Sequence, residues 1–227
     1  MGDVGTGKST IVEKITGENN RSSPLNESFT KSTAIFRVPD GSLVVADTPG
    51  SNSLKEQLQH NVWIAAAINY RPVSIIFIVV KAEARIDCVI SNIRKYSDRY
   101  IALPFSVIAV LVTHMDKVEW RKEHITPKVK KEIGIDKIAF SSKNTKGEIL
   151  VFDILKICAG GKVYNLTVNT ENFFRLFNIH DSLRSILQST NDEVEQFIAK
   201  KKAFDEARKV FKGNLYFLNP DLYHCNK

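Results

Sequence analysis

Cysteine is scarce in this chain of 227 residues. The three cysteines, Cys88, Cys158 and Cys225, are odd in number and far apart in the sequence. Disulfide-stabilised domains carry dense, even sets of cysteines, and cysteine zinc sites need closely spaced pairs. The spacing therefore predicts reduced thiols in a cytosol-like compartment, and it argues against both a disulfide framework and a zinc site.

Long apolar runs are also missing. The longest, residues 73–80 and 105–112, have the length of strands, whereas a membrane-spanning helix needs about 20 apolar residues. No secretory signal is recognisable ahead of Gly2, so we expect a cytoplasmic protein. The net charge is +7, but the basic residues do not alternate with aromatics, and nucleic acid is therefore not an expected partner.

A phosphate-binding loop lies at the start of the sequence. Residues 2–9 read Gly-Asp-Val-Gly-Thr-Gly-Lys-Ser and fill every fixed position of the pattern G-x-x-x-x-G-K-[ST]. Its glycines let backbone N–H groups surround phosphates at the start of a helix. We expect Lys8 to contact the β- and γ-phosphates as a catalytic charge and Ser9 to bind Mg²⁺. The nucleotide-binding residues expected here are Gly2, Asp3, Val4, Gly5, Thr6, Gly7, Lys8, Ser9 and Thr10.

A second phosphate-site motif follows a predicted hairpin. Two apolar runs, residues 33–38 and 42–46, flank a tight-turn sequence at residues 39–41. The second run is followed by Asp-Thr-Pro-Gly at residues 47–50. Asp47 ends a buried strand beside the phosphate loop and suits an outer-sphere contact to Mg²⁺. Gly50 could donate its N–H to the γ-phosphate.

A magnesium-binding threonine is expected between these two motifs. Thr30 lies in the segment Phe-Thr-Lys-Ser at residues 29–32, after an Asn- and Ser-rich stretch typical of a mobile loop. We interpret Thr30 as a magnesium ligand and a catalytic contact. The alternative is a threonine at a strand edge.

A base-recognition motif follows the second long apolar run. Residues 113–116 read Thr-His-Met-Asp. The carboxylate of Asp116 would accept hydrogen bonds from N1–H and the exocyclic amine of guanine, a donor pair that adenine lacks, and an unpaired carboxylate facing the wrong base is penalised. Downstream, a backbone N–H at Ser141 or Ser142 would reach the guanine carbonyl.

These motifs, in this order, resemble those of the translation-factor-class GTPases. The chain is most similar to their septin-like group, which holds the avirulence-induced and immunity-associated GTPases and the chloroplast import GTPases. The resemblance rests on residues 2–9, 29–32, 47–50 and 113–116, and it covers roughly residues 1–160. It implies a three-layer α/β G domain that binds GTP or GDP with Mg²⁺ and dimerises across its nucleotide face.

One position departs from the common guanine motif, [Asn/Thr]-Lys-x-Asp. His114 stands in place of the lysine, whose stem normally lies over the base. An imidazole could stack there instead, and the immunity-associated group also relaxes this position; the alternative is an ordinary loop histidine. Because of His114, an ATP-using P-loop protein stays open as an alternative.

The side chain that would place the attacking water is not identifiable. No Gln immediately follows Gly50, and no arginine finger is evident; Ser51 and Asn52 are the alternatives. Two functions remain: a slow GTPase that self-associates as a switch or assembly factor, and a non-catalytic GTP-dependent scaffold, at a membrane surface or elsewhere. We interpret His60 as a surface histidine and Arg71 as a cation at a helix end.

Alternating helical and apolar patterns predict a mostly parallel sheet covered by helices on both faces. Beyond the hairpin, helices are expected at residues 54–70, 86–96, 118–133 with a break near Pro127, and 148–158, and strands at residues 73–80, 105–112 and 137–140. The strand that normally precedes a P-loop is missing. We expect an N-terminal truncation, or a strand supplied by another segment or a partner.

Three parts are expected along the chain. The G domain covers residues 1–160 and ends at an Ala-Gly-Gly break. Residues 161–180 form a connector, and residues 181–227 form a helical extension with a long helix from Asp181 to Lys212. Its near-heptad apolar spacing suits a helix packed on the G domain, a coiled coil or partner helix, or a helix on a membrane surface.

Overall fold

The computed structural model describes residues 1–18, 33–50, 57–99, 103–160 and 162–168, and the single positions 195 and 199. The chain divides into two compact units, Met1–Asp181 and Ser182–Lys227. In the second unit only Glu195 and Ala199 are described, both helical and exposed. The long helix expected from Asp181 to Lys212 otherwise lies outside the described residues, so the fold below is that of the first unit.

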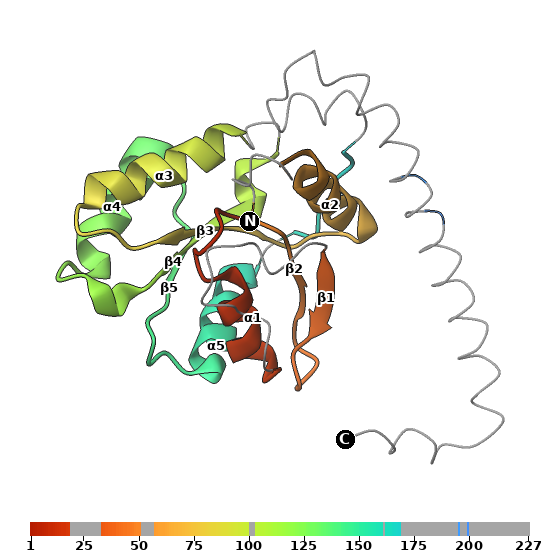
Figure 1. Ribbon diagram of the computed structural model, residues 1–227, viewed down its shortest axis with the longest axis horizontal. Helices are drawn as coiled ribbons and strands as arrows, with labels where there is room; N and C mark the ends of the chain where they lie inside the picture. The colour runs from red at the N-terminus through yellow and green to blue at the C-terminus, as the bar shows by residue number, and fades with distance from the viewer. Residues whose placement is uncertain are drawn as a thin grey trace. The chain divides into compact units, whose positions relative to one another are not determined.

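Helices and strands alternate along the first unit (Figure 1). In chain order they are α1 Lys8–Thr16, β1 Ala34–Arg37, β2 Val44–Asp47, α2 Gln57–Tyr70, β3 Ile76–Lys81, α3 Ile86–Arg99, β4 Ile108–Thr113, α4 Lys122–Ile133, β5 Ile138–Phe140 and α5 Gly147–Cys158. Short 3₁₀ turns cover Phe105–Val107 and Met115–Lys117. The predicted α/β class is confirmed. None of the helices in the described part of the chain combines the length and apolarity that crossing a bilayer requires.

The strands form two sheets. β1 and β2 pair antiparallel, with Ala34 opposite Asp47, as the hairpin prediction requires. β3, β4 and β5 pair in parallel in that order. Met1 lies along the edge of β3: its amine donates to the carbonyl of Phe77 at 2.7 Å, and its own carbonyl accepts the N–H of Val79 at 2.7 Å. Among the described residues no ladder joins β2 to β3, so the hairpin and the parallel sheet are held together by side-chain packing.

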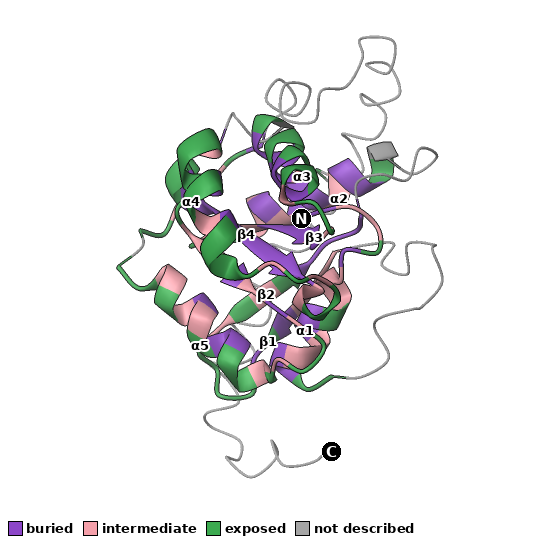
Figure 2. Cartoon of the chain, turned by 90° about the vertical axis from the view of Figure 1, so that its left-hand side faces the viewer, coloured by how far each residue is buried: buried purple, intermediate pink, exposed green. Residues whose placement is uncertain are grey.

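Helices cover both faces of the parallel sheet. α1 and α5 lie together on one face, and α3 and α4 lie on the other (Figures 1 and 2). Because both faces are covered, every residue of β4 is buried, which explains its continuous apolar run. One core cluster joins α1, α5, the hairpin and the sheet; its members include Ile11, Ile15, Val38, Val79, Leu111, Leu150 and Ile154.

Two predicted strands are shorter than expected. The run predicted as a strand from residue 105 opens with a 3₁₀ turn, in which Val107 donates to the carbonyl of Pro104 at 3.0 Å. Val73 is not part of β3; it forms an isolated antiparallel bridge with Tyr164, with two backbone bonds of 2.9 Å. In both places a contact outside the strand takes the backbone groups that a ladder would use.

The helices after β3 also differ in detail. α4 begins at Lys122 rather than at residue 118, and before it the Trp120 indole N–H donates to the carbonyl of Glu83 at 2.7 Å. The expected break near Pro127 does not occur, because α4 runs through it. Arg71 follows the end of α2, with its guanidinium 5.1 Å from the centre of the Tyr70 ring.

Candidate functional site

The phosphate-binding loop leads directly into α1, which begins at Lys8. The Lys8 ammonium folds back over the loop and donates to the carbonyls of Gly2 at 3.0 Å and Asp3 at 2.6 Å. Burial lowers the pKa of Lys8 to about 8, and the carboxylates of Asp47 and Asp3 oppose that shift. The loop therefore holds a buried cation whose proton is loosely bound.

Ser9 and Asp47 meet beside this cation. The Ser9 hydroxyl donates to a carboxylate oxygen of Asp47 at 2.9 Å, although the two residues come from α1 and β2. Asp47 is 4% exposed. Within the described ranges no cluster of three His, Cys, Asp or Glu side chains could hold a metal alone. Mg²⁺ commonly uses one or two protein oxygens together with phosphate oxygens and water, so this pair fits that ion.

Thr30, the third magnesium contact expected from the sequence, lies outside the described residues, as do Ser51 and Asn52.

Gly50 packs directly against the phosphate-binding loop. A Cβ on Gly50 would lie 2.6 Å from Cγ2 of Val4 and 2.9 Å from its backbone nitrogen. Only glycine therefore lets the second motif approach the first this closely. The sequence motifs at residues 2–9 and 47–50 share one site, as their order along the chain led us to expect.

His60 is a site residue that the sequence analysis missed. It is 1% exposed, so the prediction of a surface histidine is wrong. Its Nδ1 lies 2.5 Å from the carbonyl oxygen of Gly50; because a carbonyl only accepts, Nδ1 must carry the proton. His60 shares a four-residue spacing with Ile64 and Ile68, which are also buried on α2. That spacing was the available signal that the imidazole faces inward.

The end of β4 is tied to the phosphate-binding loop. The Thr113 hydroxyl donates to the carbonyl of Thr6 at 2.7 Å, and its oxygen lies 2.9 Å from Nδ1 of His114. Because the hydroxyl has one proton, His114 donates from Nδ1 to Thr113. His114 has a left-handed backbone, with φ 58°, and its Cε1 would lie 3.5 Å from a Cβ on Gly7.

His114 is therefore held beside the phosphate loop as a neutral ring. Burial is the main cause that lowers its pKa, and Lys117 and Lys81 lower it further. A base-stacking role for the ring stays a prediction.

Asp116 meets the loop after β5. Its carboxylate accepts the N–H of Lys143 at 2.7 Å, and this bond is the main cause that lowers the pKa of Asp116. The N–H of Ser142 donates to the Thr145 hydroxyl at 2.8 Å, and the N–H of Ser141 donates to the carbonyl of Val112 at 2.8 Å. Asp116 is thus held ionised next to the segment from which the sequence predicted a base contact.

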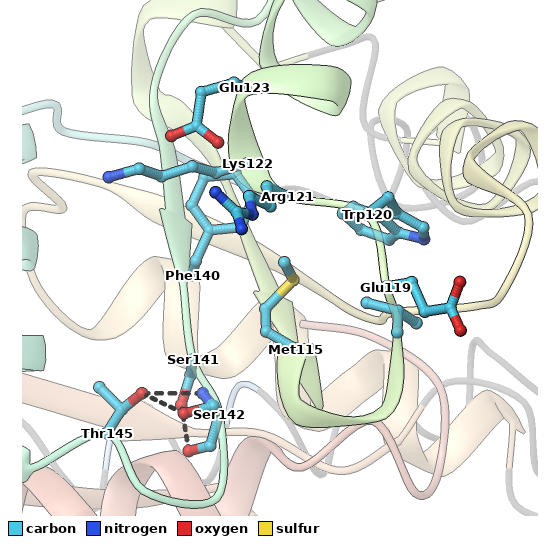
Figure 3. Close-up of a pocket in the computed structure, with 11 residues that line it drawn as sticks. Met115, Glu119, Trp120, Arg121, Lys122, Glu123, Phe140, Ser141, Ser142 and Thr145 are labelled. Carbon is cyan, nitrogen blue, oxygen red and sulfur yellow. Dashed lines mark hydrogen bonds between the residues drawn. The ribbon is translucent and has the colours of Figure 1, made fainter.

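A cavity of about 450 Å³ lies beside this loop (Figure 3). Ser142 and Thr145 are joined by hydrogen bonds at one end, and Glu119 and Trp120 lie at the other. The rest of the wall comes from Met115, Val118, Arg121, Lys122, Glu123, Phe140 and Ser141. No residue of the phosphate-binding loop lines it, and neither does Asp116. The cavity is therefore a neighbour of the candidate site and not the site itself.

Comparison with known proteins agrees with this geometry. A family profile described as "50S ribosome-binding GTPase" matches residues 1–112, slightly less than half of the chain. A solved structure of S. thermophilus NFeoB, a double variant bound to GDP and AlF₄⁻, covers 91% of this chain and 90% of its own, with 17% sequence identity and a TM-score of 0.57. No curated protein matches the chain significantly.

At this level of identity the solved structure bears on the fold alone, and the profile bears on the general class of GTPase. Neither comparison distinguishes the avirulence-induced and immunity-associated group from other GTPases. The strand order, the phosphate-binding loop at the start of α1 and the solved structure agree with one another, and the chain therefore has the fold of a P-loop GTPase G domain.

Proposed function

We propose that this chain binds GTP and GDP together with Mg²⁺ and hydrolyses GTP slowly. The observation that carries the proposal is the meeting of groups from separate segments: Lys8 with Ser9 from α1, Asp47 from β2, and the Thr113 contact that ties the base motif to the phosphate loop. Such folds bind ligands at the carboxyl ends of their parallel strands. The GTPase profile and the neighbour bound to GDP and AlF₄⁻ support the proposal.

The phosphate half of the site would act through charge and position. Lys8 would neutralise charge on the β- and γ-phosphates, and backbone N–H groups of residues 2–9 would surround them. Ser9 and Asp47 would hold Mg²⁺, which when bound supplies further charge neutralisation. His60 donates to the carbonyl of Gly50, and so fixes the position of the last residue of the second motif, residues 47–50.

The base half would select guanine. Asp116 is held as a carboxylate by the N–H of Lys143, and a carboxylate has acceptor positions for both guanine donors. Adenine presents no such pair of donors, so ATP would leave the carboxylate facing an acceptor. An ATP-using protein is the competing reading that the first experiment tests.

Titration with fluorescent GTP, GDP and ATP in the presence of Mg²⁺ tests this proposal. We expect tight binding of GTP and GDP, weak binding of ATP, and loss of binding in Lys8→Ala. Asp116→Asn should move the preference from GTP to xanthosine triphosphate, because the amide donates where the carboxylate accepted. Equal affinity for ATP and GTP would rule out the role given to Asp116.

Within the GTPases we place the chain next to the avirulence-induced and immunity-associated group, because of the Thr-His-Met-Asp sequence at residues 113–116. By that resemblance it would self-associate across its nucleotide face, with residues 181–227 available to a partner or a membrane surface. Turnover per molecule should then rise with protein concentration. Tight binding without turnover at any concentration would instead favour a GTP-dependent scaffold.

A further inference from the structure

The last turn of helix α1 contacts the loop between β5 and α5, residues 141–147. The ammonium of Lys14 donates to three backbone carbonyls of one loop: Ser142 at 2.7 Å, Lys143 at 3.0 Å and Thr145 at 3.2 Å. An ammonium has three protons to donate, so this loop uses all of them. Lys14 is separated from the loop by about 130 residues of sequence, and the contact exists only in the fold.

The three bonds set the direction of the loop's amides. In a planar trans peptide unit the C=O and N–H point in opposite directions. The carbonyl of Ser142 points to Lys14, so the N–H of Lys143 points the other way, and it donates to Asp116 at 2.7 Å. Lys14 thus determines how this loop presents its donors to the carboxylate that would read the base.

A second contact packs the same turn of α1 closely against the start of α5. A Cβ on Gly147 would lie 1.8 Å from the carbonyl oxygen of Lys14, so any side chain at this position would force α5 away from α1. Burial lowers the pKa of Lys14, and the charge of the Asp116 carboxylate opposes that shift. The side chain and the backbone of Lys14 are therefore both fitted to the segment between β5 and α5.

We propose that Lys14 is a positioning residue for base recognition, and that through it α1 couples the phosphate site to the loop at residues 141–147. This inference rests on the proposed guanine binding. α1 carries Lys8 and Ser9 in its first turn and Lys14 in its last, and nine helical residues span only about 13 Å. A short helix fixed at both ends holds the two halves of the site in one geometry.

Loss of the Lys14 ammonium should affect the base half of the site and leave the phosphate half unchanged. Without the ammonium, the three carbonyls lose their common partner, and the loop no longer holds the amide of Lys143 against Asp116. The phosphate-binding loop keeps its own contacts, because the bonds of Lys8 and Ser9 do not involve Lys14. Base affinity and base selectivity should fall while phosphate affinity stays.

The experiment compares Lys14→Met with Lys156→Met in the full chain. Lys156 is exposed on α5, so its variant makes the same charge change. Dissociation constants are measured for GDP, ADP and inorganic pyrophosphate with Mg²⁺. We expect Lys14→Met to weaken GDP binding by about tenfold, the size expected for lost charged hydrogen bonds. The preference for GDP over ADP, measured as the ratio of their dissociation constants, should fall by a similar factor. Pyrophosphate affinity should stay within about twofold, and Lys156→Met should match wild type throughout.

Gly147→Ala gives a second test that keeps the charge. Its methyl group would push α5 away from the Lys14 carbonyl, and we expect the same loss of selectivity with unchanged pyrophosphate affinity. The proposal is overturned if Lys14→Met keeps the wild-type ratio of GDP to ADP affinity. It is also overturned if the affinities for GDP and pyrophosphate fall by the same factor. Wild-type protein with no preference for GDP over ADP would instead refute the proposed function itself.

Discussion

Lys8 is the residue on which the proposed phosphate chemistry most depends, and burial makes its ammonium easier to deprotonate than an exposed lysine. Its ammonium is bonded to two carbonyls of its own loop, and burial lowers its pKa to about 8. A bound phosphate would favour the protonated form. Nucleotide binding and the protonation of Lys8 are therefore linked.

The linkage predicts a pH dependence with a definite sign. The pKa of Lys8 in the free protein is about 8, and a bound phosphate raises it, so affinity is fully present below that pH and is lost above it. We expect GDP to bind about tenfold more weakly at pH 9 than at pH 7. Calorimetry at pH 8.5 in two buffers of different ionisation enthalpy should show proton uptake. A constant affinity with no proton uptake would contradict this reading of Lys8.

His60 gives a second prediction for a single residue. His60→Leu removes the donor to the Gly50 carbonyl in a buried place, and an unsatisfied buried acceptor costs about 1–3 kcal/mol. We expect that loss in the free energy of unfolding, measured in urea, together with weaker binding of a non-hydrolysable GTP analogue relative to GDP. The change should affect GTP more because, in the proposed site, the second motif ends at Gly50 and would face the γ-phosphate.

His60→Asn is the matched control, since its amide nitrogen can replace Nδ1 as the donor and should recover part of both losses. An unchanged ratio of the two affinities in His60→Leu would show that the histidine serves stability alone.

Among the elements, α4 shows how packing outweighs local preference. Pro127 lies inside the helix, where it removes one backbone bond and ordinarily costs about 3 kcal/mol. Ile125 and Val129, on either side of Pro127, are both completely buried. Their burial stabilises α4 through the position where the sequence predicts a break.

Pro127→Ala should therefore stabilise the protein. Alanine restores the missing bond and removes the ring, while the unfolded chain regains some freedom, which offsets about 1 kcal/mol. We expect a net gain of about 2 kcal/mol in the free energy of unfolding from urea titration. Pro127 is exposed, so no core contact is lost. An equal or lower stability would mean that α4 has adapted to the proline.

At the scale of the whole first unit, the segment after α5 returns to the start of the sheet. Tyr164 pairs with Val73 through two backbone bonds of 2.9 Å. The side chain of Asn69 bonds both backbone groups of Val168, at 2.9 Å to its carbonyl and 2.7 Å from its N–H. These contacts join α2 and the residues just after it to residues about 90 to 100 positions further along the chain.

Asn69→Ala tests whether the contact between α2 and the segment after α5 stabilises the first unit. It leaves two backbone groups of the buried Val168 without their side-chain partner, and we expect a loss of about 1–3 kcal/mol in the free energy of unfolding. GDP affinity should not change, because none of the site contacts described above involves Asn69. Asn165→Ala, at an exposed position in the same segment, is the control and should stay within about 0.5 kcal/mol of wild type. Equal stability of the two variants would show that the contact of Asn69 with Val168 does not stabilise the protein.

Much of this architecture could be predicted from local patterns. The glycines and lysine of residues 2–9 require a turn into a helix, and α1 begins at Lys8. The hairpin followed from two apolar runs around a turn sequence, and β4 from one long apolar run. These features depend on neighbours in the sequence, which is why composition and spacing reveal them.

The sequence by itself determined the order of the motifs, the α/β class and which side chains could carry charge to a phosphate or a base. The tertiary structure alone decided that His60 is buried against Gly50, that Lys14 holds the loop after β5, and that α4 continues past Pro127. Each of these depends on segments far apart in the chain that meet only when the core packs. No local pattern records such a meeting, because its free energy comes from burial and hydrogen bonds between distant residues.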